Sequence, residues 1–287
     1  MLGESMTSPI LVTGGTGTLG RLVVRRLRDA DRNVRVLSRC SHKSGDGIEF
    51  MTGDLATGEG IEAAVDGVKT IVHCAGSAKG DEDKARNLVQ AASWAGAQHL
   101  VYISVVGADR IPVVSPVDRA MFGYFASKRD AEKVVEDSGL PWTTLRATQF
   151  HDLILAVAQQ MAKLPVIPVP ARIRFQPVDA GEVADRLVEL SLGEPSGMVP
   201  DMGGPQVYGA AELLHGYLRA IQRRRLVIPV WLPGKAARAF GAGANLAPEQ
   251  AVGHRTWEEF LTERCRRDTS RQRVATNEGT SDENAIA

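Results

Sequence analysis

The stretch ILVTGGTGTLGRLVVRRL, residues 10–27, constrains the fold more than any other part of the chain, because four glycines fall within seven residues between an apolar run and a helical pattern. These glycines are Gly14, Gly15, Gly17 and Gly20, which satisfy both G-x-x-G-x-x-G and G-x-G-x-x-G. A strand that turns directly into a helix uses glycine for the tight turn, for close approach of the backbone to a pyrophosphate and for helix packing. A helix from Leu19 would offer its free N–H groups and positive dipole end to the phosphates. The loop therefore predicts a dinucleotide site.

Five further apolar runs of strand length follow the first one, at residues 34–38, 48–51, 70–75, 99–104 and 142–147. Helical patterns occupy the gaps between them, at residues 19–30, 59–67, 81–96 and 126–139. Short apolar strands that alternate with helices are typical of a parallel sheet covered on both faces. The fold class that we predict is α/β, a doubly wound parallel sheet of the Rossmann type.

The alternation loosens after about residue 149, which suggests a division of the chain. We expect a dinucleotide-binding domain over residues 1–150 and a smaller mixed lobe over residues 151–265 that binds substrate at the carboxyl ends of the strands. Residues 266–287 are polar and poor in apolar side chains, so we predict a disordered tail there.

Composition favours small-molecule partners. The chain has 34 basic and 34 acidic residues, so no overall field draws it to nucleic acid or to an anionic membrane. The run Arg223–Arg225 is read as a solvated face, and no spacing of Cys and His indicates a metal site. The chain starts without a signal-peptide pattern and contains no apolar run of membrane-spanning length, so the prediction is a soluble, cytoplasmic protein without a membrane span.

The residues at the end of the second predicted strand indicate whether the cofactor is NAD(H) or NADP(H). An acidic residue there would bind the ribose 2′-OH of NAD, but the chain has Ser38 and Arg39 instead. An arginine suits a 2′-phosphate, so NADP(H) is the preferred cofactor and NAD(H) stays open. The plainer interpretation of Arg39 is a solvated residue at a strand end.

The chain resembles the atypical short-chain dehydrogenase/reductase superfamily, in its NmrA-like, NAD(P)H-binding branch. The likeness rests on TGGTGTLG at residues 13–20, GDL at 53–55 and HCAG at 73–76, and covers residues 8–150 most strongly. It implies that Asp54 and Leu55 contact adenine and that the third segment passes beside the adenosine ribose. The cofactor-binding residues that it implies, beside Ser38 and Arg39, are Gly14, Thr16, Gly17, Thr18, Leu19, Gly20, Asp54, Leu55, Cys74, Ala75, Gly76 and Lys128.

The same resemblance implies three catalytic residues. Tyr124 would be the proton donor, Lys128 would orient the nicotinamide ribose and lower the tyrosine pKa, and Ser104 would polarise a carbonyl. Residues at i and i+4 share a helix face, and a phenol transfers protons poorly at neutral pH without an adjacent cation. The alternative is a Lys128 that only binds ribose and a Tyr124 that only packs. Asn87 is the one central candidate for the asparagine of the family's proton relay.

The function we expect is an NADPH-dependent oxidoreductase that reduces a small carbonyl, enone or quinone. A non-catalytic NADP(H) sensor or accessory subunit is the alternative, and isomerase or dehydratase chemistry is a third. His151, just after the sixth strand, is a candidate for substrate contact or for a structural hydrogen bond. The helices from Asp81 and Ala126 are the usual dimer faces of the superfamily, so a homodimer is among the expectations.

Overall fold

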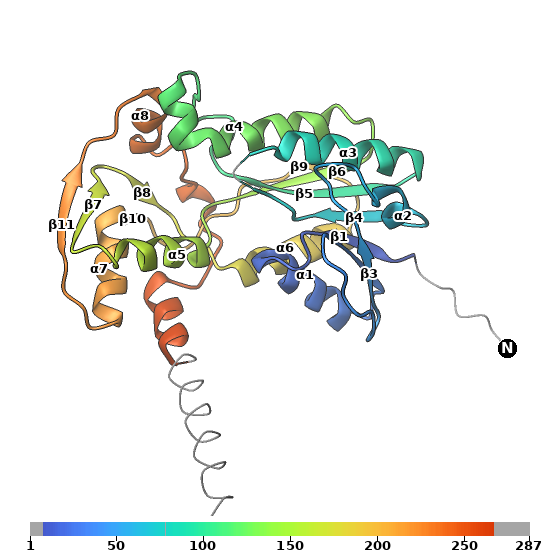
Figure 1. Ribbon diagram of the computed structural model, residues 1–287, viewed down its shortest axis with the longest axis horizontal. Helices are drawn as coiled ribbons and strands as arrows, with labels where there is room; N and C mark the ends of the chain where they lie inside the picture. Colours follow the sequence, from blue (N-terminus) through green and yellow to red (C-terminus); the bar gives the residue numbers. More distant parts are fainter. Residues whose placement is uncertain (1–7, 78, 267–287) are drawn as a thin grey trace, which may run out of the picture.

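The computed structural model describes residues 8–77 and 79–266, which form a central parallel sheet with helices on both faces (Figure 1). The strand order is β3 (Ile48–Thr52), β2 (Val34–Ser38), β1 (Ile10–Thr13), β4 (Thr70–His73), β5 (His99–Val105), β6 (Trp142–Ala147) and β9 (Gly197–Met198). Every neighbouring pair in this sheet is parallel. The doubly wound α/β fold is confirmed, and the order reverses between β1 and β4, where such sheets bind ligands.

Two helical layers cover the sheet. Helices α1 (Thr18–Asp29) and α6 (Ala180–Leu192) lie side by side on one face. The other face carries α2 (Ile61–Val65), α3 (Asp81–Trp94) and α4 (Pro116–Glu136), with α3 packed between the other two (Figure 1). Each layer has its own cluster of buried aliphatic side chains against the sheet, so the β-strands are apolar on both faces.

Helix α6 and strand β9 correct the predicted lobe boundaries. Residues 180–198 fall within the segment expected to be the lobe, yet they belong to the sheet domain. The reason is the apolar face of α6, on which Val183, Ala184 and Leu187 are completely buried in the cluster that α1 also lines. The lobe is therefore built from two separate segments, one before α6 and one after β9.

Helix α4 begins at Pro116, well before the expected start near residue 126. Ser115 caps it, because its hydroxyl accepts a hydrogen bond from the Asp118 N–H at 3.1 Å while the Asp118 carboxylate accepts from the Ser115 N–H at 3.2 Å. This capping box with proline at the first helical position is a strong start signal. Tyr124 therefore lies in the middle of a long helix and not at its start.

A buried ion pair fixes α4 to the sheet. The Glu132 carboxylate accepts two hydrogen bonds from Arg146 of β6, at 2.7 and 2.8 Å, and both side chains are buried. Asp109, which follows β5, forms a further ion pair with Arg146, with its Oδ2 atom 2.9 Å from Nη1 of the arginine. Bidentate pairs of this kind are directional, so this contact sets the position of α4 relative to the carboxyl ends of β5 and β6.

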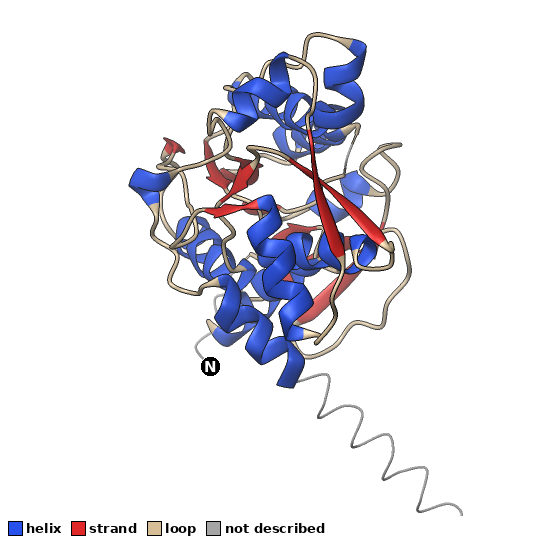
Figure 2. Cartoon of the chain, turned by 90° about the vertical axis from the view of Figure 1, so that its left-hand side faces the viewer, coloured by secondary structure: helices blue, strands red, loops and turns tan. Residues whose placement is uncertain are grey.

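The C-terminal lobe contains two short strand pairs and several helices (Figure 2). Strand β7 (Val166–Pro170) pairs in parallel with β11 (Leu226–Val230), and β8 (Arg174–Phe175) pairs antiparallel with β10 (Tyr208–Gly209). Its helical segments are α5 (His151–Met161), α7 (Ala210–Ala220), α8 (Lys235–Gly241), the 3-10 turn η1 (Pro248–Gln250) and a helix over residues 257–266. Three small apolar clusters hold these parts together.

The end of the chain differs in one respect from the prediction. Residue 266, the first of the expected tail, is the last described residue of the helix over residues 257–266. The remaining residues of that prediction, 267–287, lie outside the described part of the chain. Within the described ranges, no helix combines the length and the apolar character needed to cross a bilayer.

Candidate functional site

The glycine loop joins β1 to α1 at the point where the strand order reverses. Gly14 has a φ of +68°, which favours glycine, and the Gly17 N–H donates to the Gly14 carbonyl at 2.9 Å to close the turn. A Cβ atom on Gly20 would lie 2.1 Å from that same carbonyl oxygen. Helix α1 then starts with Gly17 as its N-cap and no side-chain cap, while Thr16, Gly17 and Thr18 are exposed. The first N–H groups of α1 are thus available to an anion.

The end of β4 lies against this loop. The Thr13 hydroxyl is 2.6 Å from Nδ1 of His73 and accepts from the Ala75 N–H at 3.4 Å, and the Cys74 N–H donates to the Thr13 carbonyl. A Cβ atom on Gly14 would lie 2.7 Å from the Ala75 nitrogen. The structure therefore brings together the glycine loop and the Cys74–Gly76 segment, as two expected parts of one cofactor site.

The end of β2 holds Ser38 and Arg39. The Ser38 hydroxyl accepts from the Cys40 N–H at 3.2 Å and lies 3.1 Å from Nε2 of His42, so it shapes the turn after the strand. Arg39 is exposed, and within residues 8–77 and 79–266 it forms no ion pair. Its guanidinium is thus free to meet an anionic group.

The segment expected at the adenine is held by an asparagine. Oδ1 of Asp54 accepts from the Ala56 N–H at 2.9 Å, whereas the Leu55 side chain is buried in the core, which leaves only its backbone for a ligand. The Leu55 carbonyl accepts from Nδ2 of Asn87 at 2.8 Å. Asn87 therefore supports this loop, and its described contacts give it no part in a proton relay.

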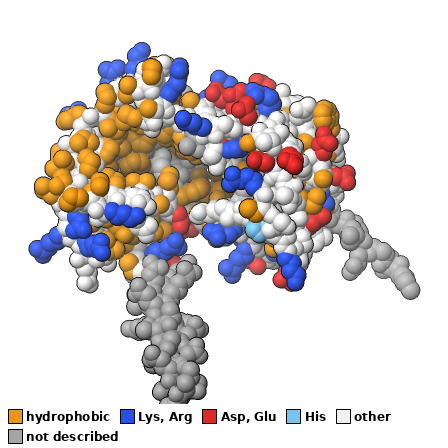
Figure 3. Space-filling view, viewed as in Figure 1, with side chains coloured by type: hydrophobic (Ala, Val, Ile, Leu, Met, Phe, Trp, Pro, Cys, Tyr) orange, Lys and Arg blue, Asp and Glu red, His pale blue; other side chains and the backbone are white. Residues whose placement is uncertain are grey.

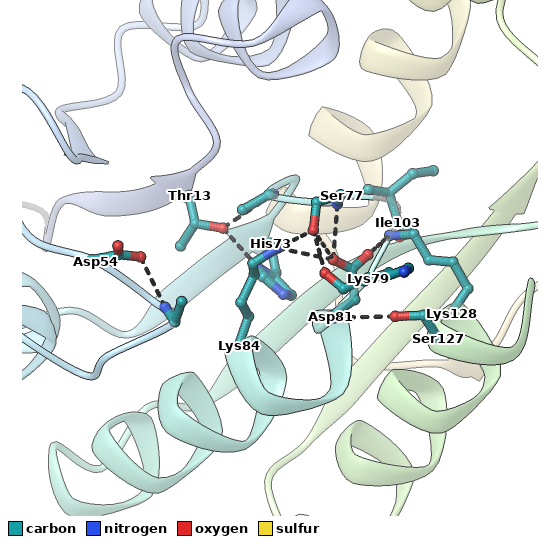
Figure 4. Close-up of polar contacts among 12 residues, drawn as sticks. Thr13, Asp54, His73, Ser77, Lys79, Asp81, Lys84, Ile103, Ser127 and Lys128 are labelled. Carbon is teal, nitrogen blue, oxygen red and sulfur yellow. Dashed lines mark hydrogen bonds and ion pairs between the residues drawn. The ribbon is translucent and has the colours of Figure 1, made fainter. Parts of the chain in front are cut away.

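Lys128 occupies the centre of a buried polar network (Figure 4). Its Nζ lies 3.2 Å from Oδ2 of Asp81 in α3 and donates to the Tyr102 hydroxyl and the Ile103 carbonyl of β5, both at 3.3 Å. Asp81 also accepts from the Ser77 N–H at 2.8 Å, and its own N–H donates to the Ser127 hydroxyl at 3.1 Å. Helices α3 and α4 are thus joined directly beside the Cys74–Gly76 segment.

Gly76 leaves room for this cation at the surface of the segment. A Cβ atom at Gly76, which is exposed, would meet Nζ of Lys128 at 3.1 Å and Oδ2 of Asp81 at 3.3 Å. A side chain at position 76 would therefore press against the buried ion pair, and glycine avoids this contact. Lys128 and Asp81 thus lie directly behind the backbone of Gly76, at the carboxyl end of β4.

The network carries one net positive charge. Lys84 and Lys128 share the single carboxylate of Asp81, whose Oδ1 lies 3.2 Å from Nζ of Lys84. Burial raises the pKa of Asp81, but Lys128 and the hydrogen bonds from Ser77 and Lys84 outweigh burial, so the pKa is lowered and the carboxylate is ionised. Burial likewise lowers the pKa of Lys128, yet Tyr102, Tyr124 and Asp81 more than offset it, so the ammonium stays charged.

Three other neighbours of Lys128, namely His73, Cys74 and Tyr102, are uncharged at neutral pH. Burial and the charge of Lys128 lower the pKa of His73 to about 3. Burial raises the pKa of Tyr102 to about 12 and that of the Cys74 thiol to about 12, with Lys128 opposing both shifts. The positive charge beside Gly76 is therefore not cancelled by these three groups.

Tyr124 and Ser104, the other two expected catalytic residues, differ in exposure. Tyr124 lies one turn before Lys128 on α4, is 37% exposed, and has its ring centre 6.0 Å from Nζ of Lys128. Burial raises the pKa of Tyr124 while Lys128 lowers it, with burial dominant. Ser104 is buried, and its hydroxyl has no hydrogen-bond partner among the described residues. Ser104 lies two residues after Tyr102 on β5, so the two side chains are on the same face of the sheet, the one that α4 covers.

The structure bears out neither role expected of His151, substrate contact or a structural hydrogen bond. His151 is completely buried, stacks on Phe260 with ring centres 5.0 Å apart, and lies 6.0 Å from the Trp257 ring. Burial is the main cause that lowers its pKa to about 4, so it is neutral at physiological pH. Neither ring nitrogen has a hydrogen-bond partner among the described residues. His151 is thus an aromatic part of the lobe core.

Two residues of the network were missed by the sequence interpretation. The sequence patterns place Asp81 only at the start of a predicted helix and Tyr102 only within a predicted strand. The DED triplet at the start of α3 gave no sign that its first carboxylate is buried while the next two are exposed or partly exposed. The capping pattern SPVD could have extended α4 back to Pro116. Within the described ranges, no three His, Cys, Asp or Glu side chains gather as metal ligands would.

Comparison with known proteins identifies a matching protein family. A family model described as NAD(P)H-binding matches residues 14–161. A (4-alkanoyl-5-oxo-2,5-dihydrofuran-3-yl)methyl phosphate reductase of Streptomyces griseus is 30% identical over 161 residues, which cover 55% of this chain and 54% of the relative. The match thus spans about half the length of that relative.

A second relative and a solved structure match more of the chain. An NAD(P)H azoreductase of Xenophilus azovorans is 27% identical over 247 residues, or 83% of each chain. An NADPH-dependent quinone oxidoreductase of Escherichia coli, solved with NADPH, superposes with a TM-score of 0.74 at 18% identity, over 88% of this chain and 99% of the other. At that identity, the likeness establishes a shared fold.

A substitution at Gly20 tests directly whether the glycine loop binds the cofactor. We expect Gly20→Ala to weaken NADPH binding at least about tenfold, because the added Cβ would collide with the Gly14 carbonyl that closes the turn. Binding is followed by the fluorescence of NADPH.

The matched control is Gly123→Ala in α4, where a Cβ would meet nothing within 4 Å. It should leave NADPH binding unchanged and raise the free energy of unfolding by about 0.5–1 kcal/mol, because alanine is the better helix former. Equal affinity of Gly20→Ala and the control would refute the assigned loop.

Proposed function

Since the chain belongs to the family of NAD(P)H-binding proteins, we propose that it is an NADPH-dependent oxidoreductase that reduces a small carbonyl, enone or quinone. The observation that carries this proposal is the pairing on α4 of a half-exposed Tyr124 with Lys128, whose charge is fixed beside Gly76 by Asp81. The names of the two relatives, both reductases, agree with it. The substrate class is our inference from the site.

The chain has residues in position to bind the pyrophosphate, the 2′-phosphate and the nicotinamide ribose of the cofactor. The N–H groups at the start of α1, after Gly14 and Gly17, would hold the pyrophosphate, and Arg39 would meet the 2′-phosphate. Lys128, reached across Gly76, would bind the nicotinamide ribose. NADPH supplies a hydride to the acceptor when it is bound.

Tyr124 is suited to give a proton and not to take one. Its raised pKa keeps the hydroxyl protonated at neutral pH, which is the form that a reduction requires from a general acid. The ammonium of Lys128, in a network of two lysines and one carboxylate with one net positive charge, would stabilise the negative charge that develops on the acceptor oxygen or on the Tyr124 oxygen. Both groups come from one helix that the Glu132–Arg146 pair anchors to the sheet.

A non-catalytic NADP(H) sensor is the second candidate, and one observation favours it. Lys128 is committed to Asp81, Tyr102 and Ile103, and among the described contacts no hydrogen bond joins it to the Tyr124 hydroxyl. A protein of this kind would bind the cofactor with the same residues but would not oxidise it. Turnover separates the two candidates.

Cofactor preference is tested with Arg39→Glu. The substitution should weaken NADPH binding at least about tenfold and leave NADH binding within about twofold, because only NADPH carries the 2′-phosphate that a charge-assisted hydrogen bond would hold. Arg25→Glu, at an exposed position on α1, is the control and should not change the ratio of the two dissociation constants. A ratio that stays constant in Arg39→Glu would remove Arg39 from the site.

Catalysis is tested with Tyr124→Phe. We expect kcat/KM for NADPH-dependent reduction of a carbonyl acceptor to fall about a hundredfold, the usual contribution of a general acid, while the dissociation constant of NADPH changes less than about twofold. Because the pKa of Tyr124 is raised above 10, the wild-type rate should stay level from neutral pH to about pH 9.

Tyr102→Phe is the comparison variant, since it removes a buried hydroxyl beside the same lysine, and it should lose less activity. Undiminished turnover in Tyr124→Phe would remove the proton-donor assignment. Tight NADPH binding by the wild type without oxidation by any carbonyl or quinone tested would favour the sensor.

A further inference from the structure

The basic and acidic residues of this neutral chain are segregated. Residues 153–178 and 213–248 contain no Asp or Glu, although they hold nine of the 34 Lys and Arg residues of the chain. These nine are Lys163, Arg172, Arg174, Arg219, Arg223, Arg224, Arg225, Lys235 and Arg238. Both segments belong to the C-terminal lobe, so the lobe carries a local positive field that the net charge conceals.

Pairing of β7 with β11 brings the two segments together and creates an apolar outer face. Val166 lies opposite Leu226, and Pro168 lies opposite Ile228, and all four are exposed. The alternate residues of β7, among them Ile167, are buried against α5 and α7. Figure 2 shows both strands at the front of the lobe, with no element over them.

Trp231 continues this apolar face directly after β11. It is 70% exposed, and the Arg172 guanidinium lies 4.8 Å from its ring centre. Figure 3 shows orange apolar side chains and blue basic ones over the lobe, while red acidic side chains lie mainly over the sheet domain. Exposed tryptophan among basic residues is typical of a surface that lies in a membrane interface.

A hollow of about 500 Å³ opens at one end of the apolar face, lined by Lys163, Pro165, Arg224, Arg225 and Leu226. Three of these five side chains are cationic. Nε of Arg225 is buried and has no hydrogen-bond partner among the described residues. Such a site could hold an anionic group, such as a phosphate.

Two other occupants fit less well. Addition of a strand from another chain needs N–H donors along an edge, but Pro168, Pro170 and Pro229 interrupt both strands of the pair. A second copy docked through the same surface would bring the cations Lys163, Arg224 and Arg225 of the hollow close to their own counterparts. An anionic bilayer matches both properties, since its headgroups meet the cations and its acyl boundary accepts the apolar face.

We propose that the β7–β11 surface, formed by Val166, Pro168, Leu226, Ile228 and Trp231 with the basic hollow beside it, docks the protein on anionic phospholipid membranes. The apolar side chains enter the headgroup region, and Lys163, Arg224 and Arg225 bind lipid phosphates. This attachment is peripheral and does not depend on the reductase activity.

The test is cosedimentation of the full chain with vesicles. The protein should sediment with vesicles of phosphatidylcholine and phosphatidylglycerol and not with phosphatidylcholine alone, and added salt should weaken the association. Lys163→Glu with Arg224→Glu, which reverses two of the cations that line the hollow, should weaken it at least about tenfold. Arg25→Glu with Lys133→Glu, at exposed positions on α1 and α4, makes the same charge change elsewhere and should have no such effect.

The apolar contribution has its own matched pair. Trp231→Ala should weaken vesicle binding and abolish the blue shift of tryptophan fluorescence that vesicles cause, whereas Trp94→Ala, with an equally exposed side chain on α3, should do neither. Circular dichroism verifies that each variant is folded, and the salt and lipid dependence of the wild type tests the proposal without any variant.

Several results would overturn the proposal. Equal association with neutral and anionic vesicles, or association with neither, would exclude an anionic bilayer. Concentration-dependent self-association that Trp231→Ala abolishes would assign the surface to a second copy. Binding to heparin as tight as to vesicles, and unaffected by Trp231→Ala, would make it a general polyanion site.

Discussion

The buried ion pair between Lys128 and Asp81 is the interaction on which the candidate site depends. It joins α4 to α3 at the carboxyl end of β4, and it places the paired Lys128 ammonium directly behind Gly76, in a network to which Lys84 adds one net positive charge. A buried lysine without its partner would be costly, so the two helices are held where the charge is paired. The glycine loop and the Cys74–Gly76 segment then face the same space, because Thr13 ties the end of β1 to the end of β4.

Two surfaces with different chemistry follow from the topology. The strand-order reversal between β1 and β4 positions the candidate nucleotide site in the sheet domain. The lobe, assembled from segments before α6 and after β9, concentrates basic and apolar side chains on β7 and β11. If the lobe rests on a bilayer, a quinone acceptor of the proposed reductase would reach the candidate site from the lipid, which would connect the two proposals while leaving each separately testable.

The sequence predicted the sheet well and the lobe poorly, for physical reasons. Glycine spacing and apolar runs are local signals, so the sequence alone predicts the loop at Gly14–Gly20 and the strands β1 to β6 of the central sheet, whereas it does not predict β7 and β11 of the lobe. The burial of His151 and Asp81 depends on side chains far away in the chain, such as Phe260 and Lys128, which no local pattern reveals. The return of α6 to the sheet and the two-residue strand β9 are likewise set by tertiary packing. Net charge was a poor guide because it sums over residues that the fold separates.

A double-mutant cycle on Asp81 and Lys128 tests the central interaction most directly. The free energy of unfolding in urea at neutral pH is measured for the wild type, Asp81→Asn, Lys128→Met and the double variant. Each single substitution should cost about 3 kcal/mol. The double should cost at least about 2 kcal/mol less than the sum of the singles, because it leaves no unpaired buried charge between these two positions. Additive costs would show that the two residues are not coupled and would contradict the account.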